Sequence, residues 1–492
     1  MAAYVLALDQ GTTGSTALVI DESGRVVGRG YREITQYYPR PGWVEHDPAE
    51  LLDRTVAAGR DAIAAAGVAP ASIRALGLTN QRETVVAWDP ASPTTAPKAI
   101  VWQDRRTTPA ITALAPHASS VAAATGLTLD PYFSGTKMAW LLDALDHRKV
   151  HIGTVDTWLL WNLTGGRVYA TEPTNASRTM LFDIDRKEWS AEMCALLGVP
   201  RELLAVVRPS SGIFGTTETS FFGAPIPIAG IAGDQQAALY GQGCHTPGTG
   251  KVTYGTGAFL LVNSGLSRPT VDSGLLVTIA CDARGAACYA VEAAIFIAGA
   301  AIQWLRDGLE IIAAANETEA LARSISSTDG VYFVPALVGL GAPHWEPRAR
   351  GTIVGITRGT TRAHFVRAAL ESIAYSTADV LGAMHAGLPA LRVDGGAAMN
   401  NWLMQFQADV LDIPVERPDM VETTAAGAAG LAGLATGIWS SPDEFLASRT
   451  FTRFDPGPGR DAAQAGAAGW STAVDTALYW ARSYIEGHGE TR

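Results

Sequence analysis

A glycine turn near the N-terminus is followed by a strand, and this order constrains the fold most. Residues 4–8 form a short apolar run that predicts a buried strand, which leads into Asp9 and a turn over residues 10–15. Residues 16–20 are apolar again, and residues 25–31 alternate as a third strand. The connections are too short for crossover helices, so we expect antiparallel strands. Rossmann and P-loop nucleotide folds need a helix directly after such a turn, so neither is predicted.

A similar element recurs near the middle of the chain. Residues 251–254 read as a strand, a Gly/Thr turn follows at 255–257, and residues 258–263 return as a strand. This repeat of pattern, without a repeat of sequence, predicts two related halves. Glycines and a proline at 241–250 are typical of a linker or hinge. We therefore predict two domains, at residues 1–243 and 244–492.

Helices are clearest in the second half. Apolar residues recur at helical spacing over 363–384, and a strand at 391–393 is followed by a helix at 401–411. The uncharged stretch 423–442 is mainly Ala, Gly and Thr, which predicts a tightly packed internal helix and no membrane span. The last ~50 residues are rich in Ala and predict further helix.

The composition argues against several classes of protein. The net charge is −11, so there is no general basicity to attract nucleic acid or anionic lipid. The four cysteines have no zinc-binding spacing and are too few for a disulfide scaffold, which fits a reducing compartment. The first nine residues carry no basic segment typical of a signal peptide. We expect a cytoplasmic protein without nucleic-acid partners or membrane insertion.

The two Gly/Thr turns are candidate phosphate sites. Each presents free backbone N–H groups and hydroxyls, which favour anions. Either turn alone reads as an ordinary hairpin. Two of them, together with Asp9 at the end of a buried strand, favour a polyphosphate held from both sides. Asp9 then suits a magnesium ion on a nucleotide, whereas the alternative is an Asp that caps its own turn.

Asp234 is the candidate catalytic base. It follows the apolar run 228–231 and precedes a segment that starts like a helix, so it should lie at a strand-to-helix junction. A helix N-cap is the structural alternative. In phosphoryl transfer, a carboxylate at such a place orients the acceptor hydroxyl and takes its proton.

Polar residues that follow the strand 73–78 suggest the edge of a second site. Arg82 and Glu83 suit a neutral polyol, which both donates and accepts hydrogen bonds. Neighbours on a strand point to opposite faces, so the backbone must leave strand geometry if both face one ligand. A surface ion pair is the alternative. Trp102 and Tyr132 could pack on the C–H groups of the polyol, or belong to the core.

Five segments resemble one family. The runs 9–13, 41–47, 79–84 and 231–236 are similar to the FGGY carbohydrate kinases, in particular to the branch that acts on glycerol, and 351–371 resembles the C-terminal FGGY signature. The family implies an α/β fold. It has two actin/Hsp70-like (ribonuclease H-like) domains with mixed sheets flanked by helices, and an interdomain cleft.

The resemblance also implies a reaction and a set of site residues. ATP, with Mg²⁺, would phosphorylate glycerol at a terminal hydroxyl to give sn-glycerol 3-phosphate, with Asp234 as the general base and Asp9 serving the metal. The implied glycerol residues are Arg82, Glu83, Trp102, Tyr132, Asp234, Gln235 and Phe259. The implied nucleotide residues are Thr12, Thr13, Gly14, Thr256, Gly299, Gln303, Gly396 and Asn400. Family members are often dimers or tetramers, so a homo-oligomer is expected by analogy.

Two departures and two alternatives remain. Family members often carry Ser and Arg where this chain has Gly14 and Thr16, which removes an expected phosphate contact. The segment 216–227 has no basic residue, whereas some bacterial members bind fructose 1,6-bisphosphate through an arginine there.

Another polyol or ketose, such as erythritol or xylulose, is the nearer alternative substrate. A non-catalytic nucleotide switch of the actin/Hsp70 kind is the more distant alternative function.

Overall fold

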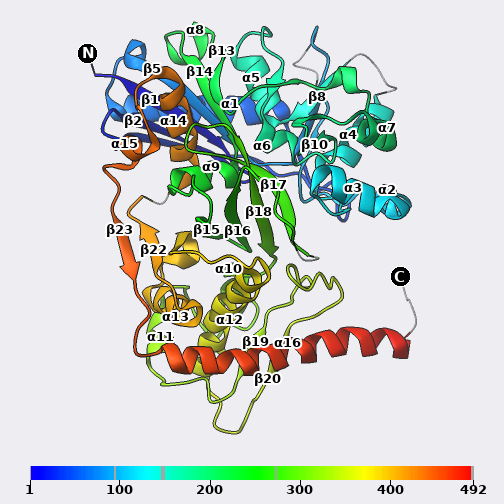
Figure 1. The fold of residues 1–492 in the computed structure, drawn as a ribbon, viewed down its shortest axis with the longest axis vertical. Coiled ribbons are helices and arrows are strands. Elements are labelled where there is room, and N and C mark those ends of the chain that lie inside the picture. Colours follow the sequence, from blue (N-terminus) through cyan, green and yellow to red (C-terminus); the bar gives the residue numbers. More distant parts are fainter. Residues whose placement is uncertain (1, 93–95, 146–149, 272–273, 421, 489–492) are drawn as a thin grey trace.

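The computed structural model describes residues 2–92, 96–145, 150–271, 274–420 and 422–488. The two halves each contain a β-sheet flanked by helices, stacked one above the other (Figure 1). The predicted α/β fold with mixed sheets is confirmed. The sequence also predicts a frayed tail at 487–492, of which residues 489–492 lie outside the described residues.

The first sheet has the strand order β13-β14-β5-β1-β2-β3. The strands β1 (Tyr4–Gln10), β2 (Gly14–Asp21) and β3 (Val26–Glu33) are antiparallel, as predicted. The strand β5 (Ile73–Asn80) is parallel to β1, β14 (Pro227–Gly233) is parallel to β5, and β13 (Ser211–Thr216) closes the edge antiparallel to β14. Three neighbouring parallel strands therefore end at the same edge of this sheet.

The second sheet repeats this topology, with the order β17-β18-β16-β15-β21-β22-β23. The bounds are β15 (Gly250–Tyr254), β16 (Ala258–Gly265), β17 (Leu276–Cys281), β18 (Ala287–Ile295), β21 (Leu391–Gly395), β22 (Val415–Pro418) and β23 (Phe451–Phe454). The hairpin β15–β16 is antiparallel, whereas β21 is parallel to β15 and β22 is parallel to β21. The internal symmetry predicted from pattern alone is thus present in the strand order.

A helix from late in the chain covers the first sheet. The helix α14 (Thr423–Thr436) is buried along most of its length and packs with Trp439 and Phe445 on the apolar face of β1, β2, β5 and β14 (Figure 1). Gly77 permits this contact, because a Cβ there would lie 2.2 Å from the Ala428 carbonyl oxygen. The predicted internal helix is confirmed, and it joins the two halves of the sequence in one core.

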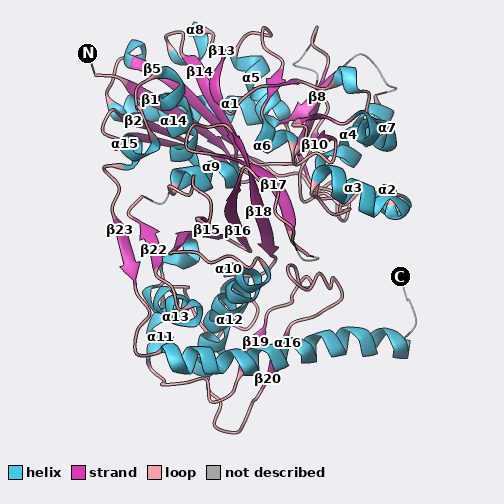
Figure 2. Ribbon diagram, viewed as in Figure 1, coloured by secondary structure: helices cyan, strands magenta, loops and turns pink. Residues whose placement is uncertain are grey.

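The other helices flank the two sheets (Figure 2). The long ones are α1 (Pro48–Ala66) on the first sheet, and α12 (Arg362–Ala383), α13 (Asn401–Leu411) and α16 (Arg460–His488) in the second half. The shorter ones are α2 (Thr108–Ala113), α3 (Ala118–Thr125), α4 (Ser134–Ala144), α5 (Val155–Leu163), α6 (Pro173–Ala176), α7 (Ala191–Leu197), α8 (Thr219–Phe222), α9 (Asp234–Gly241), α10 (Gly299–Asp307), α11 (Glu317–Arg323) and α15 (Pro442–Leu446).

Short strands complete the fold. They are β4 (Glu45–His46), β6 (Val85–Trp88), β7 (Ala99–Ile100), β8 (His151–Thr154), β9 (Ala170–Thr171), β10 (Phe182–Asp183), β11 (Glu188–Trp189), β12 (Val206–Val207), β19 (Tyr332–Val334) and β20 (Thr352–Val354). The prediction that the last ~50 residues are all helical is wrong for β23. Its residues pair with β22, and this sheet contact overrides the local preference for helix.

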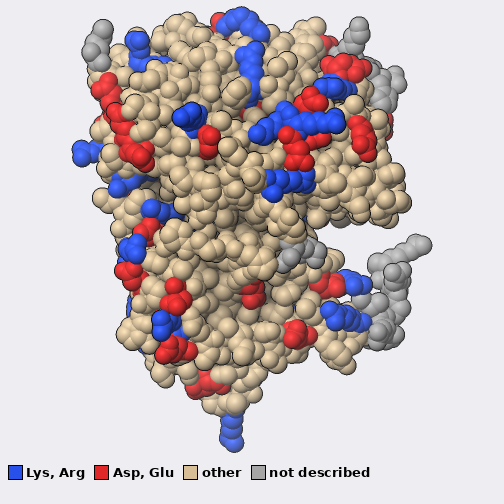
Figure 3. All heavy atoms as spheres, in the orientation of Figure 1, with Lys and Arg blue, Asp and Glu red and all other residues tan. Residues whose placement is uncertain are grey.

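The surface carries acidic and basic side chains of mixed sign on the face shown in Figure 3. Within the described part of the chain, no helix combines the length and hydropathy that a membrane crossing requires. The four cysteines are buried and free.

Candidate active site

The predicted acidic and basic site residues meet where β1, β5 and β14 end. Asn80 at the end of β5 lies opposite both Gln10 of β1 and Gly233 of β14. The N–H of Gln81 donates to the carbonyl of Gln10 at 2.7 Å, which holds the loop after β5 against the first glycine turn. Because parallel strands bring their carboxyl ends to one edge, the residues that follow them converge there. This edge therefore carries Asp9, the loop after β5 and the start of α9.

Arg82 and Glu83 both lie inside the protein. Each side chain is 2% exposed, so the alternative of a surface ion pair is wrong. Glu83 has a positive φ of 63°, which is rare for a residue with a side chain. This turn of the backbone takes the pair out of strand geometry, as predicted for two neighbours that face one site.

Arg82 is the centre of a buried charge cluster. Its Nη1 and Nη2 donate to the two carboxylate oxygens of Glu292 at 2.7 Å each, and its Nε lies 3.3 Å from Oδ1 of Asp234. Arg178, just after α6, donates to Glu83 at 2.6 Å and to Glu292 at 3.1 Å. Glu292 belongs to β18, so residues of both sheets meet in this cluster.

Asp234 has the environment of a base. It is the first residue of α9, whose N-cap is Gly233, so the N-cap alternative is wrong. Its side chain is 29% exposed and accepts a hydrogen bond from the Gln235 N–H at 2.7 Å. Burial raises its pKa, while the positive charge of Arg82 opposes that rise. Burial and the nearby charge of Asp234 raise the pKa of Asp9 to about 8.

Lys251 links this cluster to the second hairpin. Its Nζ donates to Oε1 of Gln235 at 2.5 Å and to Oγ1 of Thr253 at 2.7 Å. Burial lowers its pKa, and the charges of Asp394 and Asp234 counter that effect. The strand that leads into the second glycine turn therefore borders the carboxylate predicted to be the base.

The predicted aromatic residues lie beside the first turn. Trp102 donates from Nε1 to Oγ1 of Thr12 at 2.9 Å, and its ring meets that of Tyr132 edge-on at 5.6 Å. Phe259 lies in β16 opposite Thr253. In the first turn itself, the carbonyl of Thr13 accepts from Ile34 at 3.0 Å.

The first turn also accounts for one sequence departure. The Gly14 carbonyl accepts from the Gly11 N–H at 3.0 Å. A Cβ at Gly14 would lie 2.5 Å from the hydroxyl oxygen of Tyr31, so the tyrosine occupies space that a side chain at position 14 would need.

Five predicted nucleotide residues line one cavity of about 590 Å³ in the second half: Thr256, Gly299, Gln303, Gly396 and Asn400. The cavity lies at the ends of the parallel strands β15 and β21, where Tyr254 pairs with Gly395. A Cβ at Gly299 would lie 2.5 Å from the Gly255 carbonyl oxygen, so glycine lets α10 start directly on the turn. The two halves thus place their polar residues at equivalent sheet edges.

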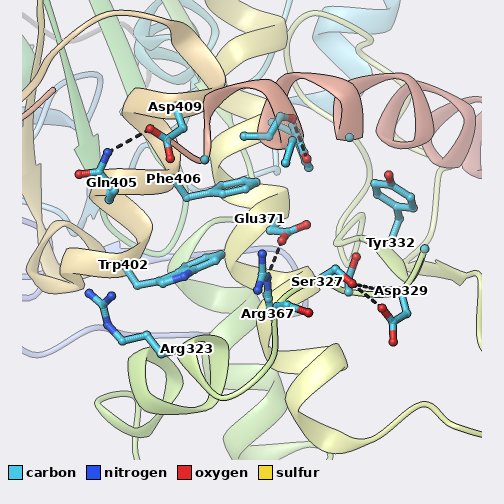
Figure 4. Close-up of a pocket in the computed structure, with 18 residues that line it drawn as sticks. Arg323, Ser327, Asp329, Tyr332, Arg367, Glu371, Trp402, Gln405, Phe406 and Asp409 are labelled. Atoms are coloured by element: carbon cyan, nitrogen blue, oxygen red, sulfur yellow. Dashed lines mark hydrogen bonds and ion pairs between the residues drawn. The ribbon is translucent and has the colours of Figure 1, made fainter. Parts of the chain in front are cut away.

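A second cavity, of about 430 Å³, lies between α12, α13 and the start of α16 (Figure 4). None of the predicted site residues lines it. Several of its polar groups already pair with one another: Arg367 donates to Glu371 at 2.8 Å, and Gln405 donates to Asp409 at 3.0 Å. The chemistry predicted from the sequence is therefore located elsewhere.

Sequence reasoning missed three of the buried charges in the site. Arg178, Lys251 and Glu292 are all 0–1% exposed. Gly250-Lys251 matches only part of a P-loop, with His245 in place of the first glycine and Val252 in place of Ser or Thr, so the sequence does not predict Lys251 as a site residue. Glu292 lies in an otherwise apolar strand segment. A single acid in such a segment is the signal that could have indicated a buried charge there.

Comparisons with known proteins identify the family. Residues 4–241 match the N-terminal domain of the FGGY family of carbohydrate kinases, and residues 250–436 match its C-terminal domain. A glycerol kinase 2 from Thermotoga maritima is 52% identical over 97% of this chain and 99% of its own length. A glycerol kinase from Bordetella parapertussis is 51% identical over 97% and 98%.

Solved structures agree with this assignment. Plasmodium falciparum glycerol kinase with ADP has a TM-score of 0.89 and is 32% identical, covering 97% of this chain and 98% of its own. A gluconate kinase from Lactobacillus acidophilus has a TM-score of 0.88 over 99% and 100%, but at 18% identity it shows only the shared fold. This chain belongs to the FGGY family of carbohydrate kinases.

Proposed function

We propose that this chain transfers the terminal phosphoryl group of ATP to glycerol and forms sn-glycerol 3-phosphate. The observation that carries the proposal is the buried cluster in which Asp234 lies beside Arg82, at the edge of the sheet that also holds Asp9. The relatives with the same overall length and about half of their residues identical are named glycerol kinases, which supports glycerol as the acceptor.

The proposed chemistry follows from these groups. Asp234 takes the proton of the attacking hydroxyl, and its raised pKa brings the base closer to the pH at which it must work. Arg82 donates to a hydroxyl and Glu83 accepts from one. Trp102, Tyr132 and Phe259 would pack on the carbon chain, and Gln235 would hold a further hydroxyl.

ATP would bind in the cavity of the second half, with its phosphates directed toward the first turn. Thr12, Thr13, Gly14 and Thr256 offer backbone N–H groups and hydroxyls to these phosphates. The relative solved with ADP supports nucleotide use.

Magnesium suits the same edge of the first sheet. Burial, and secondly repulsion from the carboxylate of Asp234, raise the pKa of Asp9 to about 8. A divalent cation beside Asp9 would relieve that repulsion, so the donor set fits Mg²⁺ held by one carboxylate and waters. The metal would neutralise charge on the phosphates.

A coupled ADP-release assay over glycerol, erythritol, xylulose and gluconate tests the proposal. We expect the highest kcat/KM with glycerol. A higher value for erythritol or xylulose would favour the alternative polyol or ketose kinase, and ADP release that no acceptor stimulates would favour a nucleotide switch.

Three features stay predictions: a domain boundary between residues 243 and 244, a dimer or tetramer, and a cytoplasmic location.

Fructose 1,6-bisphosphate is expected not to inhibit. Two arginines from other elements do reach the segment 216–227, but Arg60 donates to the carbonyls of Phe221 and Ser220, and Arg167 pairs with Glu218. Each guanidinium is therefore already held by groups of this segment. Initial rates measured up to millimolar effector check this, and inhibition in that range would contradict it.

A further inference from the structure

Glu292 brings a carboxylate from the second sheet into the acceptor site of the first half. It lies in β18 and its side chain is only 2% exposed, yet its two oxygens accept three hydrogen bonds. Two come from Arg82 at 2.7 Å each, and the third comes from Arg178 at 3.1 Å. A bidentate pair of this kind fixes the plane of the guanidinium as well as its position.

This pairing decides which donors of Arg82 remain for a ligand. Nη1 also donates to Oε1 of Gln236 at 3.2 Å, and Nε faces Asp234. Among the contacts within the described chain, the second hydrogen of Nη2 is left over. Without the carboxylate of Glu292, the guanidinium could rotate toward Glu83 or Asp234 and no longer present that hydrogen to an acceptor hydroxyl.

We infer that Glu292 is a positioning residue for the phosphoryl acceptor, holding Arg82 in its binding orientation and tying the second sheet to the acceptor site. This inference rests on the proposed function and extends it to a residue of the opposite half. Arg178 has the supporting role, because it bridges Glu292 and Glu83 and so aligns both carboxylates around Arg82.

Glu292 also acts on the base through its charge. Asp234 lies in a cluster of charged groups that come from five segments of the chain: Asp9, Arg82 with Glu83, Arg178, Lys251 and Glu292. The negative charge of Glu292 raises the pKa of Asp234. If that charge is removed, the pKa of Asp234 falls, so the base stays ionised to lower pH. The acid limb of the kcat/KM profile should therefore move to lower pH.

Steady-state kinetics of Glu292→Gln and Glu292→Asp test the inference, with Tyr289→Phe as the control. Tyr289 lies on the same strand and donates at 2.9 Å to Asp185, which is the partner of Arg268. For Glu292→Gln we expect the acceptor KM to rise about tenfold, the ATP KM to change less than about twofold, and the acid limb to shift down. Glu292→Asp keeps the negative charge, so the acid limb of the kcat/KM profile should lie where it does in the wild type. Because the aspartate is shorter, the acceptor KM should stay raised.

Equal rises in both KM values, or an unmoved acid limb, would overturn the inference and leave a structural ion pair. If Glu292→Gln does not fold, Glu292→Asp alone decides through its acceptor KM. The wild-type enzyme is first assayed on the acceptor panel, and the variants are then assayed on its best substrate. If the best substrate is not glycerol, the proposed substrate is refuted. The comparison of the acceptor KM with the ATP KM would still test the role of Glu292.

Discussion

Replacing Asp234 by Asn is expected to leave the fold intact and to lower kcat by about 10²–10⁴-fold. The amide cannot accept the proton of the acceptor hydroxyl. Folding should survive, because the side chain is partly exposed and its backbone partner, the Gln235 N–H, can still bond to the amide oxygen. The ATP KM should change little, because Asp234 does not line the cavity proposed for ATP.

The decisive measurement for Asp234→Asn is kcat with saturating glycerol and ATP, alongside a thermal melt. Asp61→Asn is a suitable control, since Asp61 pairs with Arg32 at the surface and lies in α1. Turnover equal to that of the wild type would remove Asp234 from the mechanism. A large drop in the melting temperature would mean that the variant loses activity because its fold is destabilised.

Replacing Arg82 by Ala is expected to raise the glycerol KM far more than the ATP KM, and also to destabilise the protein. In the proposed function the guanidinium donates to the acceptor, whereas the cavity proposed for ATP lies in the other half. Its removal also leaves Glu292 and Glu83 buried with fewer partners. Breaking a buried pair in this way costs about 3–5 kcal/mol.

Denaturant unfolding and two-substrate kinetics separate these effects. Arg32→Ala is the matched control, because its partner Asp61 is 38% exposed and can be solvated when the arginine is lost. Equal rises in both KM values would reduce Arg82 to a structural ion pair. A stability equal to that of the wild type would show that the buried carboxylates find other partners.

Local pattern was sufficient to predict the strand–turn–strand units and to single out Asp9, Arg82 and Asp234, each of which lies within four residues after a short apolar run. That the three runs become neighbouring parallel strands, which brings these residues together, was not predicted from local pattern. The second Gly/Thr turn was also predicted from local pattern. The individual residues predicted to bind the nucleotide came from the family resemblance and not from spacing.

The pairing across the two halves could not be predicted from the sequence. Arg82 and Glu292 are 210 positions apart, and nothing near Glu292 in the chain indicates an arginine partner. The antiparallel strand β23 was missed for a related reason. Its residues become a strand only because β22 lies beside them, and pairing partners distant in sequence leave no local pattern.

The position of α14 bears on how this chain is made. The strand face formed by Val5, Ala7, Leu18 and Ile20 is completed only by residues 425–445. During synthesis, roughly the first 420 residues must leave the ribosome before that face is covered. The nascent N-terminal half therefore presents an uncovered apolar sheet for most of translation, which makes it a substrate for chaperones and a poor candidate for expression as a separate fragment.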